Sequence, residues 1–127
     1  MNIGLVANDT KKKLMQNFCI AYKGILSKHT IYATETTGTL IEKVTNLTVH
    51  KFLSGELGGE QQLASQIEHN NIDLVIYLKD TAMQMQIHSG LANITHLCDL
   101  YNIPIATNLA TAELMVRAID KGFLDWR

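Results

Sequence analysis

The sequence predicts a three-layer α/β sandwich built on a five-stranded, parallel, doubly wound sheet. Short apolar segments alternate along the chain with segments of helical periodicity, as in parallel sheets covered on both faces. Residues 3–7 and 73–78 are the clearest apolar segments, and both are typical of strands buried on both faces. A chain of 127 residues suits one domain with one core, so we expect a single domain over residues 1–127.

The first strand is followed by a turn at residues 8–10 and by a helix over residues 11–26. That helix is predicted because apolar side chains recur there at helical spacing. A second strand follows over residues 30–33, where β-branched and aromatic residues are grouped.

The middle of the chain contains two turns that are rich in small and polar residues. The first, residues 34–38, leads into a short helix over 38–46 and a third strand over 49–52. The second is the Gly-rich turn, which we define as residues 54–59, and it leads into a helix over 60–70.

The fourth strand, residues 73–78, is followed by a loop over 79–90 and a helix over 91–101. A fifth strand is predicted over 103–107, with the only proline of the chain at its start, where one ladder donor can be spared. Thr111 is the expected cap of a last helix over 112–121.

Composition and charge exclude several function classes. The net charge of -1 gives no electrostatic footprint for nucleic acid, and no apolar run is long enough to cross a bilayer. The start of the chain lacks the pattern of a signal peptide, and Cys19 and Cys98 lie inside apolar helical patterns. We therefore expect a cytoplasmic protein with buried, reduced thiols and no membrane partner. The sequence contains no CxxC or His-x-x-x-His pair, so no metal site is expected.

Ligands of doubly wound sheets bind beyond the carboxyl ends of the strands. This rule brings five turns, distant in sequence, to one edge of the sheet. They are residues 8–12, 34–38, 54–60, 79–90 and 107–108.

The Gly-rich turn is the feature around which these segments are organised. Its glycines allow backbone N–H groups to approach a ligand, and the helix that follows presents unpaired donors and a positive dipole end. Glu60 stands at that helix start. A carboxylate beside a bound anion is a candidate general base.

Two further features favour an anionic ligand, and each has a structural alternative. Thr34, Thr36 and Thr37 could supply hydroxyls to a phosphate at a helix start, or serve as an ordinary N-cap with spare threonines. Lys12, in the first turn after the first strand, is unfavourable for the helix dipole and would suit an anion. Alternatively, it belongs to a solvated run of three lysines.

Three more side chains are candidates at this edge. Asp9 and Asp80 each follow a strand and could orient a ligand or a lysine, or cap a turn. His88, in the loop over this edge, is the best histidine for proton transfer or for polarising a carbonyl.

Taken together, these segments resemble the methylglyoxal synthase family. The resemblance covers essentially the whole chain. The matching segments are Leu5-Val6-Ala7-Asn8-Asp9, Tyr32-Ala33-Thr34-Glu35-Thr36-Thr37-Gly38, Ser54-Gly55-Glu56-Leu57-Gly58-Gly59-Glu60-Gln61-Gln62 and Asn102-Ile103-Pro104-Ile105-Ala106-Thr107-Asn108-Leu109-Ala110-Thr111-Ala112.

The resemblance implies a homohexameric carbon–oxygen lyase that converts dihydroxyacetone phosphate to methylglyoxal and inorganic phosphate through an enediolate, without a cofactor. It implies that Glu60 is the base and that His88 handles protons at the substrate oxygens. The residues implied in substrate binding are Asn8, Lys12, Thr34, Thr36, Thr37 and Gly55. Asp9 and Asp80 match family acids that support the site.

The sequence departs from the family pattern at this site. Asn8 replaces a histidine, Glu60 replaces an aspartate, and Glu35 and Glu56 place acids in the two turns. The longer side chain of Glu60 moves its carboxylate by about 1 Å, and a displacement of that size can cost roughly 100-fold in rate. His88 matches only after a one-residue shift. The alternative function is therefore a non-catalytic paralogue that binds a phosphorylated small ligand as a sensor or regulatory subunit.

Overall fold

The computed structural model describes residues 1–82 and 90–127, and its centre is a five-stranded sheet in the order β3-β2-β1-β4-β5. Every pair of neighbouring strands is parallel. The strands are β1 (Asn2–Ala7), β2 (Thr30–Thr34), β3 (Val49–Phe52), β4 (Leu74–Leu78) and β5 (Ile105–Ala106).

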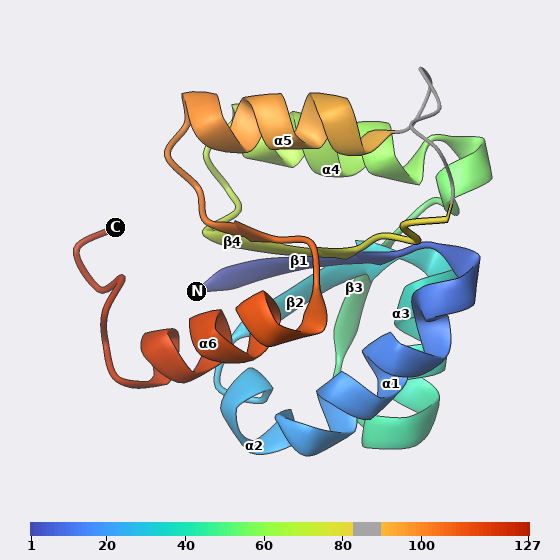
Figure 1. Cartoon of the computed structure of the whole chain (residues 1–127), viewed down its shortest axis with the longest axis horizontal. Coiled ribbons are helices and arrows are strands. Elements are labelled where there is room, and N and C mark those ends of the chain that lie inside the picture. Colours follow the sequence, from blue (N-terminus) through green and yellow to red (C-terminus); the bar gives the residue numbers. More distant parts are fainter. Residues whose placement is uncertain (83–89) are drawn as a thin grey trace.

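Helices cover both faces of the sheet (Figure 1). One face carries α4 (Gly59–Glu68) and α5 (Gly90–Leu100). The other face carries α1 (Lys12–Ala21), α2 (Lys23–Leu26), α3 (Glu35–Thr45) and α6 (Leu109–Asp120). Two short 3-10 turns, η1 (Asp9–Lys11) and η2 (Gly55–Leu57), precede α1 and α4. The predicted three-layer fold is confirmed.

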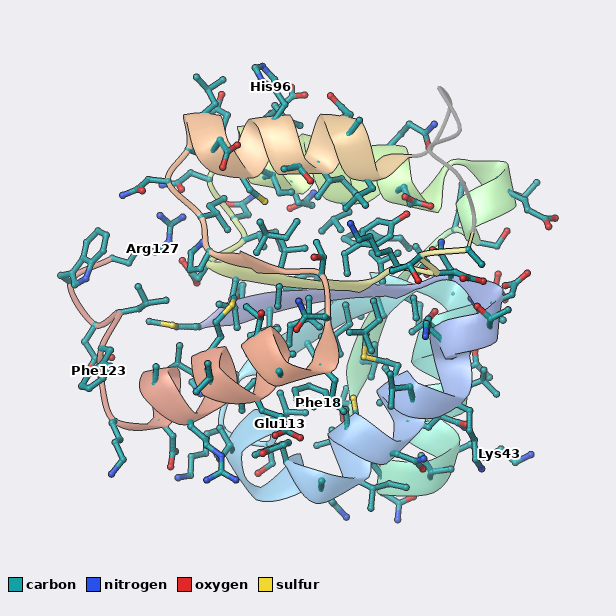
Figure 2. All side chains as sticks on the ribbon, in the orientation of Figure 1. Phe18, Lys43, His96, Glu113, Phe123 and Arg127 are labelled. Atoms are coloured by element: carbon teal, nitrogen blue, oxygen red, sulfur yellow. The ribbon has the colours of Figure 1, made fainter. Side chains whose placement is uncertain are left out.

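Each face of the sheet has its own hydrophobic core. Ile3, Leu5 and Ile76 face the α1, α3 and α6 layer, where Phe18 is buried. Val75 and Tyr77 face the α4 and α5 layer. In Figure 2, Lys43 on α3 and His96 on α5 project outward from opposite outer layers. The alternation of side chains along β4 therefore directs Tyr77 toward the helix that begins with the Gly-rich turn.

The two edges of the sheet have different neighbours (Figure 1). We call the edge where the strands end the carboxyl edge, and the opposite one the amino edge. Because all strands run parallel, α1, α3 and α4 all begin at the carboxyl edge. The tail after α6 lies beyond the amino edge.

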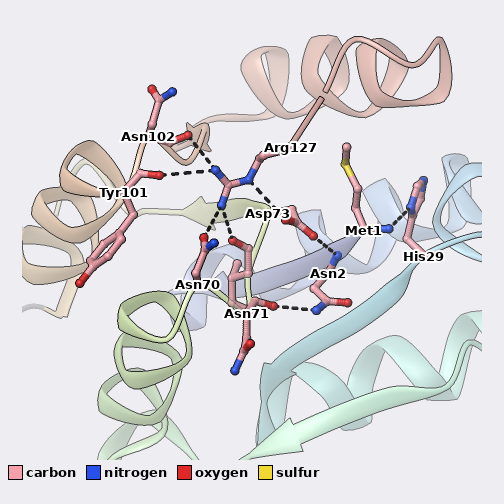
Figure 3. Close-up of polar contacts among 10 residues, drawn as sticks. Met1, Asn2, His29, Asn70, Asn71, Asp73, Tyr101, Asn102 and Arg127 are labelled. Atoms are coloured by element: carbon pink, nitrogen blue, oxygen red, sulfur yellow. Dashed lines mark hydrogen bonds and ion pairs between the residues drawn. The ribbon is translucent and has the colours of Figure 1, made fainter. Parts of the chain in front are cut away.

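Arg127 joins that tail to the amino edge (Figure 3). Its Nη2 donates to Asn70 Oδ1 at 3.0 Å and to the Ile72 carbonyl at 3.1 Å. Its Nε lies 3.3 Å from Asp73 Oδ1, which is close enough for an ion pair but lacks hydrogen-bond geometry. Asp73 Oδ2 accepts a hydrogen bond from the Asn2 backbone N–H at 2.8 Å. Asp73 thus has the structural role expected of an acid at a strand start.

Several predicted boundaries were wrong. The predicted helix over 38–46 begins at Glu35, because the threonines form its first turn instead of a separate loop. The last helix begins at Leu109 instead of residue 112, since Asn108 caps it: Asn108 Oδ1 accepts from the Thr111 N–H at 3.0 Å. The helix predicted over 11–26 is interrupted at Tyr22, which separates α1 from α2.

The expected state of the cysteines is confirmed. Cys19 and Cys98 are buried, free thiols on opposite faces of the sheet. Burial raises the pKa of each thiol to about 12. None of the helices in residues 1–82 and 90–127 is both long and apolar enough to cross a membrane.

Candidate active site at the carboxyl edge

The Gly-rich turn delivers Glu60 to the carboxyl edge. Gly58 has a φ of 102°, and a Cβ on Gly59 would lie 1.8 Å from the Leu53 carbonyl oxygen, so both positions require glycine. Gln62 Oε1 accepts a hydrogen bond from the Leu53 N–H at 2.6 Å and closes the turn. The start of α4, and with it Glu60, is therefore held against the end of β3.

The half-buried carboxylate of Glu60 contacts three neighbours. Tyr77 donates its phenol O–H to Glu60 Oε1 at 2.7 Å. The other oxygen, Oε2, lies 3.5 Å from the position that a Cβ on Gly55 would occupy. A Cβ on Gly90 would lie only 2.3 Å from Oε1. One carboxylate oxygen therefore faces Tyr77 and Gly90, and the other faces Gly55 in the Gly-rich turn.

Tyr77 belongs to this site, although the sequence indicated only a strand residue. Burial raises the pKa of the Tyr77 phenol, and the hydrogen bond to Glu60 and the carboxylate charge raise it further. A hydrogen bond from the Asn8 side chain acts in the opposite direction. The signal in the sequence was a tyrosine within an otherwise aliphatic strand, because a buried tyrosine hydroxyl usually finds a hydrogen-bond partner.

The threonines of residues 34–37 lie at the start of α3. Thr34 is buried and occupies the N-cap position without a side-chain capping bond. Thr37 is 1% exposed, and its Oγ1 has no hydrogen-bond partner among the residues that the structure describes. The amides of a first helical turn also lack intrahelical acceptors. The Glu35 amide has an acceptor outside the helix, the Leu53 carbonyl at 3.4 Å, so the Thr37 hydroxyl is the unpartnered group that this end of α3 presents at the carboxyl edge, after β2.

Lys12 is held at the same edge by internal partners. Its Nζ donates to the Ala7 carbonyl at 2.9 Å and lies 3.1 Å from Asp9 Oδ1. Its side chain is 18% exposed, whereas that of Asp9 is 95% exposed. An ammonium group has three donors, so a third remains for a ligand. Asp9 therefore orients a lysine, one of the two roles expected for it.

Asn8 and Asp80 connect the loops after β1 and β4. The Asp80 N–H donates to Asn8 Oδ1 at 2.8 Å, and the Asn8 N–H donates to the Leu78 carbonyl at 3.1 Å. Asp80 itself accepts from Thr10 Oγ1 at 2.6 Å and from the Ala82 N–H at 2.9 Å. Asp80 therefore braces these two loops.

Three further predictions concern the acids Glu35 and Glu56, the histidine His88, and the presence of a metal site. Glu35 and Glu56 are exposed, so solvent screens their charges from the turns they occupy. His88 lies outside the described residues, and its role stays a prediction. Within residues 1–82 and 90–127, no group of three or more His, Cys, Asp or Glu side chains could hold a metal ion.

Comparison with known proteins gives a consistent result. The family model described as MGS-like domain matches residues 15–107. Methylglyoxal synthase of Caldicellulosiruptor saccharolyticus is 55% identical over the whole chain and 90% of its own length. That of Listeria welshimeri is 49% identical over the whole chain and 95% of its own length.

A solved structure also matches the chain. The crystal structure of methylglyoxal synthase from Elizabethkingia anophelis has a TM-score of 0.83 and 40% identity, over 91% of this chain and 76% of that one. None of these comparisons supports the non-catalytic alternative. On these similarities, the chain belongs to the methylglyoxal synthase family, a family of lyases.

Proposed function

We propose that this protein converts dihydroxyacetone phosphate to methylglyoxal and inorganic phosphate. Removal of a proton from the hydroxymethyl carbon gives an enediolate. Its electron pair then breaks the carbon–oxygen bond to phosphate, and the resulting enol takes up a proton to become methylglyoxal. The substrate dianion and the products contain the same atoms and charge, so the reaction needs no water, oxidant or reductant. The names of the relatives and the arrangement of the carboxyl edge support this proposal.

Glu60 is the base in this proposal. Its Oε1 is occupied by the Tyr77 hydrogen bond, and its Oε2 faces Gly55. A general base must lie within hydrogen-bond reach of the proton it removes, and Oε2 is the oxygen placed toward the turn that would hold the substrate. Its partly buried position limits competition from water for that contact.

The observation that carries the proposal is the unpartnered hydroxyl of Thr37. Buried polar groups are nearly always hydrogen-bonded, and leaving one unsatisfied costs about 1–3 kcal/mol. A phosphate oxygen would satisfy this hydroxyl together with the first-turn amides of α3. The unsatisfied donor is therefore best explained as one half of a ligand contact.

The other proposed ligands come from turns at the same edge of the sheet. Thr34 and Thr36 add hydroxyls, Lys12 adds its remaining ammonium donor, and Gly55 adds a backbone amide with no side chain in the way. Asn8 binds substrate or fixes Tyr77 from the end of β1. We retain His88 as the proposed proton donor to the substrate oxygens.

The family resemblance also leads us to propose a homohexamer located in the cytoplasm. Sedimentation velocity on the purified chain tests the assembly. A single species near six times the mass of the chain is expected, and a monomer would contradict the proposal.

The reaction is tested by incubating the protein with dihydroxyacetone phosphate and measuring methylglyoxal and phosphate release in parallel. Equal amounts of the two products are expected from the wild type. Glu60→Gln should lower turnover by about 100-fold or more, because an amide cannot take the proton. Thr45→Val, at the far end of α3, is the control and should retain turnover.

Two outcomes would contradict the proposal. If the wild type releases no product above background at high enzyme concentration, the reaction is wrong. If Glu60→Gln is as active as the wild type, the reaction stands but the base is a different residue.

A further inference from the structure

Glu60 accepts a hydrogen bond from Tyr77 that a general base does not need in order to accept a proton. The phenol of Tyr77, which is 2% exposed, donates to Oε1 at 2.7 Å. Tyr77 projects from β4, an interior strand of the sheet that is buried along its whole length. Its phenol therefore has little freedom to move, whereas a glutamate side chain has three rotatable bonds.

We propose that Tyr77 is a positioning residue for Glu60, which fixes Oε1 through its phenol and leaves Oε2 as the oxygen that removes the proton. This inference rests on the proposed function. The two oxygens differ in their surroundings: Oε1 lies between Tyr77 and Gly90, and Oε2 lies toward Gly55. A carboxylate oxygen that already accepts a strong hydrogen bond is the poorer base, so the free oxygen reacts.

Asn8 completes the arrangement by orienting the phenol. Its Oδ1 accepts from the Asp80 N–H at 2.8 Å, which leaves its amide N–H₂ to donate to the Tyr77 oxygen. The phenol proton is thereby directed at Glu60. A chain of hydrogen bonds thus runs from the loop after β4 through Asn8 and Tyr77 to Oε1.

Gly90 provides the space for this orientation. A Cβ at residue 90 would lie 2.3 Å from Oε1 and 3.0 Å from the carboxyl carbon of Glu60. The carboxylate of Glu60 therefore occupies volume that any other residue at the start of α5 would fill. The longer glutamate reaches both Tyr77 and this space, and an aspartate, shorter by one methylene, would fall short of the phenol.

The test is a double-mutant cycle with Tyr77→Phe and Glu60→Asp, measured as kcat and KM for dihydroxyacetone phosphate. Tyr77→Phe should lower kcat by roughly 10- to 100-fold with KM within about twofold, because a charge-assisted contact to the base is lost. In the Glu60→Asp background the same substitution should change kcat by less than about threefold, since the phenol contact is already absent.

The pH dependence provides a readout that a merely structural role would not change. A hydrogen bond donated to a carboxylate favours its charged form. Without it, kcat/KM of Tyr77→Phe should fall off at a higher pH than in the wild type, on the acid side of the profile. Tyr22→Phe is the matched control, because the Tyr22 phenol contacts Arg117 on the opposite face of the sheet. It should leave kcat, KM and the pH profile unchanged.

Crystal structures of the wild type and Tyr77→Phe keep this inference separate from the reaction. The Glu60 carboxylate should turn away from residue 77 in the variant, whether or not the protein turns over the substrate. An unmoved carboxylate, an unchanged kcat, or an equal effect of Tyr77→Phe in the wild-type and Glu60→Asp backgrounds would overturn the inference. If Tyr77→Phe does not fold, the test uses fluorotyrosine in place of tyrosine. It is incorporated into the wild type and, as a control for the Tyr22 position, into Tyr22→Phe. A stronger phenol donor should shift the acid side of both profiles to lower pH, and unshifted profiles would overturn the inference.

Discussion

The two edges of the sheet differ in how their polar side chains are partnered. At the amino edge, Arg127 contacts Asp73 and four further acceptors, and its side chain is 9% exposed. At the carboxyl edge and within the described part of the chain, the buried Thr37 hydroxyl has no partner, and the three donors of the Lys12 ammonium group have two partners, Ala7 and Asp9. Among the described residues, the amino edge leaves one buried donor, Arg127 Nε, without a hydrogen bond but beside the Asp73 carboxylate, whereas Thr37 Oγ1 at the carboxyl edge has no partner.

This difference separates stability from function within one fold. Satisfied buried polar groups stabilise the native chain, whereas an unsatisfied group costs free energy until a ligand arrives. Under the proposed function, the carboxyl edge gives up some stability for phosphate binding. Changes at the amino edge should affect unfolding, and changes at the carboxyl edge should affect turnover.

The largest effect on turnover outside the proposed catalytic and binding side chains is expected from Gly90→Ala. The added Cβ would meet Glu60 Oε1 at 2.3 Å, and the flexible end of the glutamate should yield before the backbone does. A displacement of about 1 Å at the base should lower kcat by roughly 100-fold. Steady-state kinetics with dihydroxyacetone phosphate measures it.

Gly24→Ala is the matched control for that substitution. A Cβ at residue 24 would meet nothing within 4 Å, and alanine favours the helix there. Its kcat should equal that of the wild type. A similar loss in both variants, or no loss in Gly90→Ala, would contradict the placement of Glu60 against Gly90.

Arg127→Ala should give the largest loss of stability at the amino edge. It removes the ion pair with Asp73 and the hydrogen bonds to Asn70 Oδ1 and to several carbonyls, so we expect a loss of about 2–3 kcal/mol in the free energy of unfolding. Denaturant unfolding measures this change, and kcat of the folded protein should not change. If Arg127→Ala unfolds like the wild type but has lost turnover, the amino edge serves function and not stability, which contradicts this account.

The fold could be predicted from the sequence because strand-like and helical segments alternate along it, and because the clearest strands, residues 3–7 and 73–78, are apolar runs that can be recognised locally. Helix starts were predicted less well. Thr34, Thr36 and Thr37 were interpreted as a turn, yet a threonine at the N-cap and two in the first helical turn are equally compatible with that composition. Asn108 caps the last helix three residues before the expected cap, Thr111, because its side-chain oxygen accepts from the Thr111 N–H.

The candidate site was predicted unevenly. The topology rule brought Glu60, Thr37 and Lys12 to one edge, as the structure shows. The role of Tyr77 was not predicted, because every residue of its strand is buried. On such a strand the sequence does not show which side chains face α4 and α5. The contact between residues 60 and 77 is a tertiary one, so a tyrosine in an aliphatic strand could signal a polar partner but could not identify it as Glu60.

Two buried threonines of α3 test the difference between unpartnered and partnered polar groups, with a smaller expected effect on stability. Thr37 and Thr45 are each 1% exposed, but Thr45 Oγ1 donates to the Ile41 carbonyl at 2.7 Å and accepts from the Leu47 N–H at 3.1 Å. Thr37→Val should stabilise the unliganded protein by about 1 kcal/mol, whereas Thr45→Val should destabilise it by about 1–2 kcal/mol. Thermal unfolding of both variants without phosphate checks the opposite signs; equal signs would contradict the account.

The smallest effect is expected from the two thiols. Because burial raises the pKa of Cys19 and Cys98 to about 12, both remain protonated at pH 8, and only the thiolate reacts. Alkylation of the native protein at pH 8 should be slow and should accelerate as pH rises or when denaturant is added. Cys98 also lines a pocket of about 240 Å³ at the amino edge. Rapid labelling of Cys98 in the native protein would show that this edge is more open than its contacts indicate.

The central claim is that the start of α3 binds phosphate. It is tested most directly by following the backbone amide signals of the isotopically labelled protein by NMR while inorganic phosphate, the proposed product, is added. We predict saturable shifts of the Thr36, Thr37 and Gly38 amides that are strongly weakened in Thr37→Val, with the Asp73 and Arg127 amides unmoved. If phosphate leaves the α3 amides unmoved, or shifts them equally in wild type and Thr37→Val, the claim is wrong.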